Sequence, residues 1–343
     1  MRARLFALAV ITGFSLLSPA RAIAAPFTDE ADAASLLTAL ERQQAYLDKD
    51  RIAPLRLGER LVTQQDLRQT AIAFAALVRE AFGTPDFERK LRERFTLIEA
   101  PAHFTGYYLP RLDARRTADS RFRFPLYARP PVLTPGAPAM TRTGIEDAGA
   151  LDGQGLEIAW VEHELDRYLL MVQGSGILRF EDGREVPVNY GGGNGHPYVS
   201  LGKLLVADGK IPVERISVPE IRRYFAEHPE ELHGYLVQNP SYVFFKLADS
   251  GPFGVSGVML TAGRSIATDK ALSPSGAIAY VRYTKDGKEQ GRFVCDQDTG
   301  SAIKGWGRAD IFWGAGDEAG LIAGTLNASG SLTYLLLTPS ATR

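Results

Sequence analysis

Apolar residues recur at helical spacing in the first part of the chain. Leucines fall at this spacing within 32–47, which predicts a helix there. Thr63, followed three residues later by Asp66, has the pattern of a capping box at the start of a second helix. Gly83 is expected to end this helix, whose apolar face comprises Leu67, Ala71, Phe74, Val78 and Ala81. Thr84-Pro85 predicts the start of a third helix that runs to about Phe95.

From about Phe104 onward, short strand patterns separated by Gly, Pro and Asp-Gly replace the helical spacing. The segments 177–190 and 280–295 each place Asp-Gly between two strand-like runs, which predicts a β-hairpin in each. One further helix is expected over 219–226, with Ser217 near its N-cap. After Asn239-Pro240 the pattern predicts strands up to Leu337. The expected fold is therefore mainly β with N-terminal helices, closed as one or more barrels so that no sheet edge is left open.

The first 25 residues have the pattern of a secretory signal peptide. Met1-Arg2-Ala3-Arg4 is basic, an apolar run extends over 5–17, and small residues follow at 18–25. The apolar run is too short for a comfortable membrane span. Cleavage fits after either Ala22 or Ala24, and no cysteine near these positions could be acylated. We therefore expect an exported, soluble protein.

The composition excludes some functions and leaves an ordinary globular core. The formal net charge is −1 and no block of Lys or Arg stands out, so a nucleic-acid partner is not expected. Cys295 is the only cysteine, which rules out an internal disulfide, and its strand-like setting predicts a buried, apolar role. The five histidines show no metal-ligand spacing, so neither a metal nor another cofactor is expected.

Two aspartates near the C-terminus are the leading candidates for chemistry. Asp298 and Asp310 lie on either side of a turn bounded by glycines. Asp310 has Ala309 and Ile311 as neighbours, and an apolar setting disfavours the charged form of a carboxyl group. An acid that stays protonated can donate a proton to a leaving oxygen. The alternative is that both aspartates only bind turn backbone, as Asp often does.

Polar and aromatic residues lie between glycines or prolines in four further segments. Tyr rings offer a flat apolar face with a polar tip, and Gln, Asn and Ser supply hydrogen bonds, so such loops suit a polysaccharide groove. The alternative for each segment is a turn that holds buried tyrosines. The four segments are Phe104-Thr105-Gly106-Tyr107-Tyr108, Val172-Gln173-Gly174-Ser175-Gly176, Asn194-Gly195-His196-Pro197-Tyr198-Val199-Ser200 and Asn239-Pro240-Ser241-Tyr242-Val243-Phe244-Phe245.

Other catalytic patterns fit less well. Asp298-Thr299-Gly300-Ser301 matches the active-site string of aspartic proteases, which need two carboxylates that share a proton. No second copy of the string follows it, and Thr268-Asp269-Lys270 does not qualify. Gln173 stands where a nucleophile elbow would need glycine. The glycine run 191–195 lacks the Lys-Ser/Thr ending of a phosphate loop.

Taken in order, these segments resemble the membrane-bound lytic murein transglycosylase A family. The resemblance covers about 104–324, and its last two aspartates belong to the family's 3D domain. It implies a double-psi β-barrel built from 26–106 and 245–343, with the 3D domain at about 250–340. A smaller β-domain, 107–244, would be inserted between these portions, and a substrate groove would run between the two domains.

The resemblance also implies an activity. The family cleaves the β-1,4 bond between N-acetylmuramic acid and N-acetylglucosamine in peptidoglycan without water, and leaves 1,6-anhydromuramoyl ends. Its catalytic acid corresponds to Asp310, which would act as acid and then as base, and its other aspartate corresponds to Asp298. We expect substrate contacts from eight residues: Thr105, Tyr107, Gln173, Ser175, Asn194, Tyr198, Ser200 and Lys304.

The resemblance further implies glycan strands as the partner, a periplasmic location and no cofactor. Cell-wall synthesis or division proteins are further candidate partners. Members of the family are often lipoproteins of the outer membrane, whereas this chain has no cysteine to acylate near its start. We therefore expect a free periplasmic protein, or one held at the cell wall or outer membrane by partners. Two alternatives stay open: a non-catalytic peptidoglycan-binding module, and a hydrolytic glycosidase on the same barrel.

Overall fold

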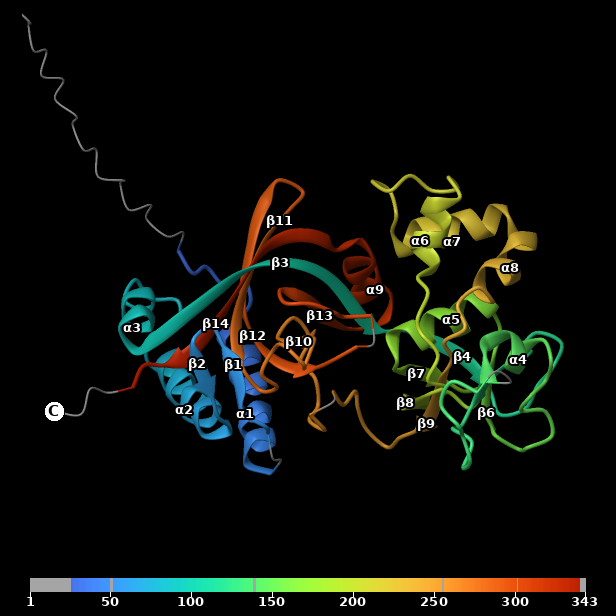
Figure 1. Cartoon of the computed structure of the whole chain (residues 1–343), viewed down its shortest axis with the longest axis horizontal. Helices are drawn as coiled ribbons and strands as arrows, with labels where there is room; N and C mark the ends of the chain where they lie inside the picture. Colours follow the sequence, from blue (N-terminus) through green and yellow to red (C-terminus); the bar gives the residue numbers. More distant parts are fainter. Residues whose placement is uncertain (1–25, 50–51, 138–139, 255, 301, 340–343) are drawn as a thin grey trace, which may run out of the picture.

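The computed structural model describes residues 26–49, 52–137, 140–254, 256–300 and 302–339. The expected signal peptide, 1–25, lies outside the described residues. Figure 1 shows a barrel with helices packed on it on one side, and a second sheet with its own helices on the other. A single long strand, β3 (Phe95–Leu109), runs from the barrel to the second part. The predicted fold class, a β-barrel beside a second β-part, is confirmed.

Six strands form the closed barrel in the order β10-β12-β11-β14-β3-β13. Besides β3, the barrel strands are β10 (Ser265–Thr268), β11 (Ile278–Lys285), β12 (Lys288–Asp298), β13 (Arg308–Ala315) and β14 (Asn327–Leu337). The pairs β10/β12 and β13/β3 are parallel, and the other pairs are antiparallel. The predicted hairpin at 280–295 is confirmed. Lys285 pairs with Lys288, and the loop residues Asp286 and Gly287 have φ of 50° and 73°, as a type I′ turn requires.

Three helices cover the outside of the barrel, as the helical spacing predicted: α1 (Ala33–Lys49), α2 (Gln64–Ala81) and α3 (Phe87–Arg94). The capping box of Thr63 and Asp66 is present at the start of α2. The third helix begins at Phe87 rather than at Thr84, because Thr84 to Asp86 form a turn first. A short hairpin of β1 (Leu55–Leu57) and β2 (Arg60–Val62) joins α1 to α2. Aromatic contacts such as Phe74 with Phe293, 5.0 Å between ring centroids, hold the helices to the barrel.

The second part is built on a six-stranded sheet in the order β5-β6-β4-β7-β8-β9. Its strands are β4 (Arg111–Arg115), β5 (Phe124–Tyr127), β6 (Glu157–Val161), β7 (Gly176–Arg179), β8 (Glu185–Gly193) and β9 (Val243–Leu247). The antiparallel pair β7/β8 confirms the predicted hairpin at 177–190. The helices of this part are α4 (Arg142–Glu146), α5 (Glu164–Gln173), α6 (Leu201–Ala207), α7 (Val218–Glu227), the 3-10 helix η2 (Pro229–Glu231) and α8 (Leu232–Leu236). The helix expected at 219–226 is α7, capped by Ser217.

The expectation of unbroken strands after residue 240 is wrong. The helix α9 (Gly316–Thr325) separates β13 from β14 and packs on β3. Its sequence contains three glycines and has little helical amphipathicity, so packing against the barrel, and not local preference, selects the helix. Cys295 is fully buried, as predicted, and burial raises the pKa of its thiol to about 12. Within the described ranges, no helix has the length and apolar character needed to cross a membrane.

Candidate active site

The barrel brings the two predicted aspartates to the same level of neighbouring strands. On β10, Ala267 pairs with Asp298 of β12 on one side and with Asp310 of β13 on the other. Asp310 in turn pairs with Thr105 of β3. Residues in register on adjacent strands share a face of the sheet and lie about 4.8 Å apart. The two acids are therefore about two strand spacings, roughly 10 Å, apart at their Cα atoms, with only a methyl group between them.

Asp310 is held by a hydroxyl and a guanidinium group. Thr105 donates its hydroxyl to Asp310 Oδ1, and Arg308 Nη1 lies 2.6 Å from the same oxygen. Arg308 Nη2 also donates to Thr105 Oγ1 at 2.7 Å, so the three side chains form a closed triangle. The side chains of Asp310 and Arg308 keep 19% and 25% of their surface exposed. This carboxylate is thus fixed by charge-assisted hydrogen bonds yet open to a ligand.

The apolar environment expected around Asp310 is observed only in part. Ala309 and Ile311 are fully buried in the barrel core. Successive side chains of a strand point to opposite faces, so these two neighbours face away from the carboxylate. The residues that do share its face stand two positions away on either side: Arg308, which binds the carboxylate, and Phe312, which is buried and apolar.

Asp298 is held by Tyr107. The Tyr107 hydroxyl donates to Asp298 Oδ2 at 2.9 Å, and the backbone N–H of Thr299 donates to Oδ1 at 2.9 Å. The Tyr107 ring packs on Phe312, 5.2 Å between centroids. Burial, together with the negative charge of Asp298, raises the pKa of Tyr107 well above its usual value. The hydroxyl therefore remains a donor and fixes this carboxylate.

A third aspartate next to this pair is sequestered. Asp296 is fully buried and binds Lys270 and the hydroxyl of Thr268. Burial raises the pKa of Asp296, although the Lys270 charge opposes the shift. The Asp296 carboxylate anchors the segment after β10, and because it is fully buried a ligand in the groove cannot reach it.

A pocket lies in front of the two acids, between the barrel and the second part. The barrel contributes Tyr107, Ala267, Asp298, Thr299, Gly300, Ala302, Ile303 and Asp310. The opposite wall consists of Arg142, Met171, Val172, Gln173, Tyr198, Asn239, Ser241 and Val243. The expected groove between the two parts is therefore present, and both predicted acids line it.

Three of the predicted contact residues lie in this pocket, and a fourth supports it. Tyr107, Gln173 and Tyr198 line the wall, while Thr105 binds Asp310 from the neighbouring strand. Gln173 Oε1 accepts the backbone N–H of Tyr108 at 3.1 Å, which leaves its amide nitrogen for a ligand. Burial raises the pKa of Tyr198, so this side chain is also a neutral hydroxyl.

Asn194 and Ser200 have structural roles that the sequence analysis did not predict. Asn194 is fully buried and donates to the carbonyl oxygens of Met140 and Pro240 at 2.6 and 2.8 Å. Its Oδ1 accepts the backbone N–H of Tyr242 at 3.0 Å. Ser200 is the N-cap of α6. The prediction that Asn194 contacts substrate is wrong, because its hydrogen bonds join three backbone segments.

Ser175 and Lys304 are not among the pocket-lining residues either. Ser175 is half-buried just after the C-cap of α5, where Gly174 has φ of 78°. Lys304 is exposed near Asp269, whose pKa is lowered mainly by the backbone N–H groups of Gly305 and Ala271. Each lies close to a pocket residue in sequence, but spacing in a glycine-rich loop does not set the direction of a side chain.

The sequence analysis missed two polar residues of the site, Arg308 and Arg142, and gave Asn239 only as part of a polar segment. Arg308 stands two residues before Asp310, a strand spacing that could have indicated it. Arg142 is almost fully buried and donates to the carbonyl oxygens of Asn239 and Ser241 at 3.1 and 2.8 Å. Asn239 Oδ1 accepts the backbone N–H of Val199 at 2.9 Å. Arg142 and Asn239 brace the wall opposite the acids, and only the tertiary structure shows this.

Comparison with known families gives two matches that together span most of the described chain. The MltA specific insert domain matches residues 103–246, and the 3D domain matches residues 264–336. The 3D domain match covers the barrel strands that carry the two aspartates, and the insert match covers the second sheet. The chain is thus of the class that joins a 3D domain to an MltA-type insert.

Individual proteins with similar sequences belong to this same class. The chain is 37% identical over 250 residues to "Membrane-bound lytic murein transglycosylase A" of Escherichia coli (strain K12), which covers 69% of this chain and 66% of that protein. Its namesake from Vibrio cholerae is 36% identical, with 70% and 67% covered. The chain belongs to the membrane-bound lytic murein transglycosylase A family. The E. coli match spans just under two thirds of that relative's length.

Solved structures resemble the whole fold. A membrane-bound lytic murein transglycosylase from Agrobacterium tumefaciens has a TM-score of 0.76 and 30% identity, and the match covers 89% of this chain and 93% of that one. E. coli MltA with bound chitohexaose also has a TM-score of 0.76, with 28% identity and 92% and 95% covered. The overall fold is therefore shared with these proteins.

Proposed function

We propose that this protein is a peptidoglycan lytic transglycosylase. It would cleave the β-1,4 bond between N-acetylmuramic acid and N-acetylglucosamine without water and leave 1,6-anhydromuramoyl ends. The names of its relatives, and the chitohexaose bound to E. coli MltA, support a glycan substrate. The observation that carries the proposal is the row of Asp298, Ala267 and Asp310 across three strands at the floor of the groove.

One carboxyl group is enough for this reaction. Asp310 in its protonated form gives its proton to the glycosidic oxygen as the bond to the muramoyl C1 breaks. The resulting carboxylate takes the proton of the muramoyl C6 hydroxyl, and the C6 oxygen bonds to C1. Ordinary glycosidases need a second carboxylate to activate water or to bond to the sugar. Here an internal hydroxyl takes that place, and its proximity supplies a high effective concentration.

Arg308 and Thr105 suit the second half of this cycle. Both bind the Asp310 carboxylate, so they stabilise the charge that remains after the proton has left. Before the first step, the Arg308 contact must loosen so that Asp310 can carry a proton. We propose that the sugar entering the groove displaces Arg308, which is one quarter exposed.

Asp298 suits an electrostatic role. Its carboxylate is fixed by Tyr107 and faces the same pocket about two strand spacings from Asp310. A fixed negative charge at this place would stabilise the positive charge that develops on the sugar ring as the bond breaks. Gln173 and Tyr198 on the opposite wall would hydrogen-bond sugar hydroxyls or acetamido groups.

The same proposal places the protein in the periplasm, at the cell wall, where its substrate lies. The signal-like sequence of 1–25 and the membrane-bound murein relatives support this location. A single Asp acting as acid and base needs no cofactor. Glycan strands are the proposed partner.

The decisive experiment compares the wild type with Asp310→Asn on purified sacculi. Asparagine keeps the size of the side chain but cannot donate a proton, so release of anhydromuropeptides should fall about 10²–10⁴-fold while binding to sacculi persists. The control Asp286→Asn makes the same chemical change in the β11/β12 turn and should keep full activity.

Mass spectrometry of the products separates the alternatives. Products heavier by one water would indicate a hydrolytic glycosidase. Binding of the wild type to sacculi without soluble products would indicate a binding module. Full activity of Asp310→Asn would show that another group is the acid.

A further inference from the structure

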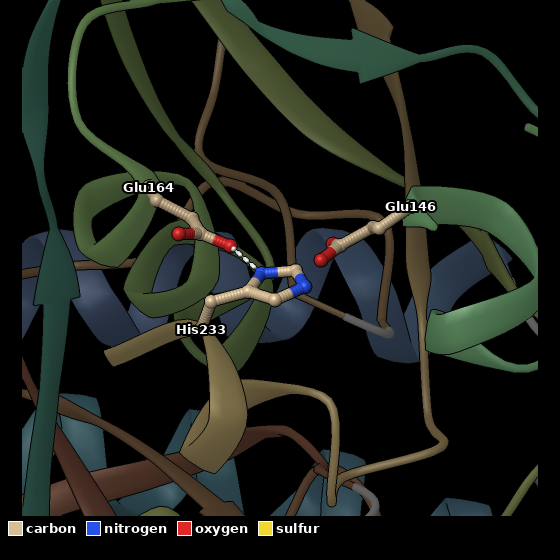
Figure 2. A group of neighbouring side chains, drawn as sticks. All are labelled: Glu146, Glu164 and His233. Carbon is tan, nitrogen blue, oxygen red and sulfur yellow. Dashed lines mark hydrogen bonds and ion pairs between the residues drawn. The ribbon is translucent and has the colours of Figure 1, made fainter. Parts of the chain in front are cut away.

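Glu146, Glu164 and His233 meet in a second pocket of the insert (Figure 2). They come from the end of α4, the start of α5 and the start of α8. One ligand atom of each lies within 4.8 Å of the others. None of the residues that line this second pocket also lines the candidate active site. The cluster is therefore a separate feature that the proposed reaction does not use.

Glu146 has one oxygen that the described part of the chain leaves without a partner. Its side chain is only 3% exposed. Oε1 receives Arg142 Nη1 at 2.8 Å and Arg167 Nη2 at 2.9 Å. Oε2 is buried, and no donor among the described residues reaches it. A buried carboxylate oxygen without a partner is costly, so its presence indicates a ligand that binds there.

His233 has the surroundings of a metal-binding histidine. Nδ1 lies 2.6 Å from Glu164 Oε1, and Nε2 lies 2.8 Å from Asp147 Oδ1. Histidines that bind a metal with one nitrogen usually have a carboxylate on the other. If Nδ1, the nitrogen next to Glu164, binds the ion, Nε2 keeps Asp147 as such a partner. Figure 2 shows the Glu146 carboxylate turned toward the imidazole ring.

We propose that Glu146, Glu164 and His233 bind one divalent cation of the zinc type. Two carboxylates and one imidazole form a ligand set that zinc accepts, with water in the fourth position. Ligand atoms about 2.1 Å from a tetrahedral zinc lie about 3.4 Å from one another. His233 Nδ1 and Glu164 Oε1, now 2.6 Å apart, must therefore separate slightly to admit the ion, and the Glu146 carboxylate must stay within the 4.8 Å that the three groups now span. His233 is 48% exposed and can make this movement.

The two arginines fit this site as supports. Arg142 and Arg167 bind Oε1 of Glu146 and so direct Oε2 into the pocket. Hydrogen-bonded partners of this kind commonly orient a ligating carboxylate. Their positive charges also weaken the attraction for a cation, so we expect weaker binding than at a site without them.

The position of the site gives it a structural role. A cation there would tie α4, α5 and α8 together. Arg142 lies at the start of α4 and Gln173 at the end of α5, and both line the candidate active site. Binding would thus stiffen the groove wall that faces the aspartates.

A second group, His228, Glu230 and Glu231, provides an internal comparison. Its ligand atoms also lie within 4.8 Å of one another. Glu231, however, already binds Lys210 at 3.0 Å and the hydroxyl of Tyr224 at 2.5 Å. Within the described chain, this group has no buried oxygen left without a partner, so we assign it no cation.

The test titrates ZnCl₂ into the metal-free mature protein and records calorimetric binding and Tm, with MgCl₂ as a parallel titration. We expect one Zn²⁺ per chain, a rise in Tm with Zn²⁺ and little effect of Mg²⁺. His233→Ala and Glu164→Gln should each weaken Zn²⁺ binding more than about 100-fold, and Asp147→Asn about 10–100-fold. His163→Ala removes an exposed histidine outside the cluster and should bind as the wild type does.

Circular dichroism of each variant shows whether it is folded. If His233→Ala does not fold, Glu164→Gln provides the test of the site in its place. The proposal is overturned if the wild type binds no Zn²⁺ at millimolar concentration. It is equally overturned if folded His233→Ala and Glu164→Gln bind Zn²⁺ like the wild type, or if His228→Ala alone abolishes binding. None of these readouts depends on cleavage of peptidoglycan.

Discussion

At Gly106, α9 packs tightly against β3, the strand whose side chains hold both aspartates. A Cβ atom at Gly106 would lie 2.6 Å from Ala323 Cα and 2.9 Å from Trp313 Cδ1. The backbone of Gly106 is not in the left-handed region, so lack of space is the only obstacle to alanine. We predict that Gly106→Ala lowers both stability and activity.

The size of the effect follows from this distance. Ordinary contact begins near 3.4 Å, so β3 and α9 must separate by about 0.8 Å to accept the methyl group. Overpacking of this kind costs about 1–3 kcal/mol. Thr105 and Tyr107, on either side of Gly106, bind Asp310 and Asp298. A misplacement near 1 Å at a reacting group can lower the rate about 100-fold.

The assay measures thermal or urea unfolding and the release of muropeptides from sacculi for the same preparations. Gly234→Ala in α8 is the matched control, because its added Cβ would meet nothing within 4 Å. Alanine is the better helix former, so this control should be as stable as the wild type or slightly more stable. If Gly106→Ala matches the wild type in both stability and activity, the close contact of α9 does not position the acids.

Two further predictions concern parts of the molecule away from the acids. Asn194→Ala should destabilise the protein by about 3 kcal/mol or more, because it leaves buried backbone groups without partners. The exposed Asn327→Ala should change the unfolding free energy little, and equal costs would contradict the structural role of Asn194. Hydrogen bonds from Arg94 and Lys90 lower the pKa of Glu80 to about 2. Its stabilising effect is therefore complete above about pH 4.5 and disappears as the pH falls toward 2. Wild type and Glu80→Gln should differ in urea midpoint at pH 6 and converge near pH 2, and a difference that grows on acidification would refute this.

The sequence predicted those elements whose cause is local. The Thr63 capping box and the Asp286-Gly287 turn each depend on a few adjacent residues, and both are present. Asp298 and Asp310 could be singled out because they lie on either side of one turn bounded by glycines, in a region of strand-like runs. Their common pocket agrees with that interpretation.

Features that depend on distant parts of the chain could not be predicted. The Gly316–Thr325 segment has weak helical preference, and it becomes α9 because β3 offers a surface to pack on. Asn194 and Tyr198 stand in one polar segment, yet the first turns inward to bind backbone and the second lines the groove. The direction of each side chain is set by the strands around it, which sequence spacing does not reveal.

The route of the chain through the barrel determines the order in which the protein can fold. β3 pairs with β14 over most of its length, from Phe95 opposite Leu337 to Thr105 opposite Asn327. The barrel therefore cannot close until the last strand has been synthesised, whereas the sheet of the insert is complete by Leu247. Pairing across so long a stretch of chain is slow. The floor of the groove, where Asp298 and Asp310 lie, therefore takes shape only after β14 is available to close the barrel.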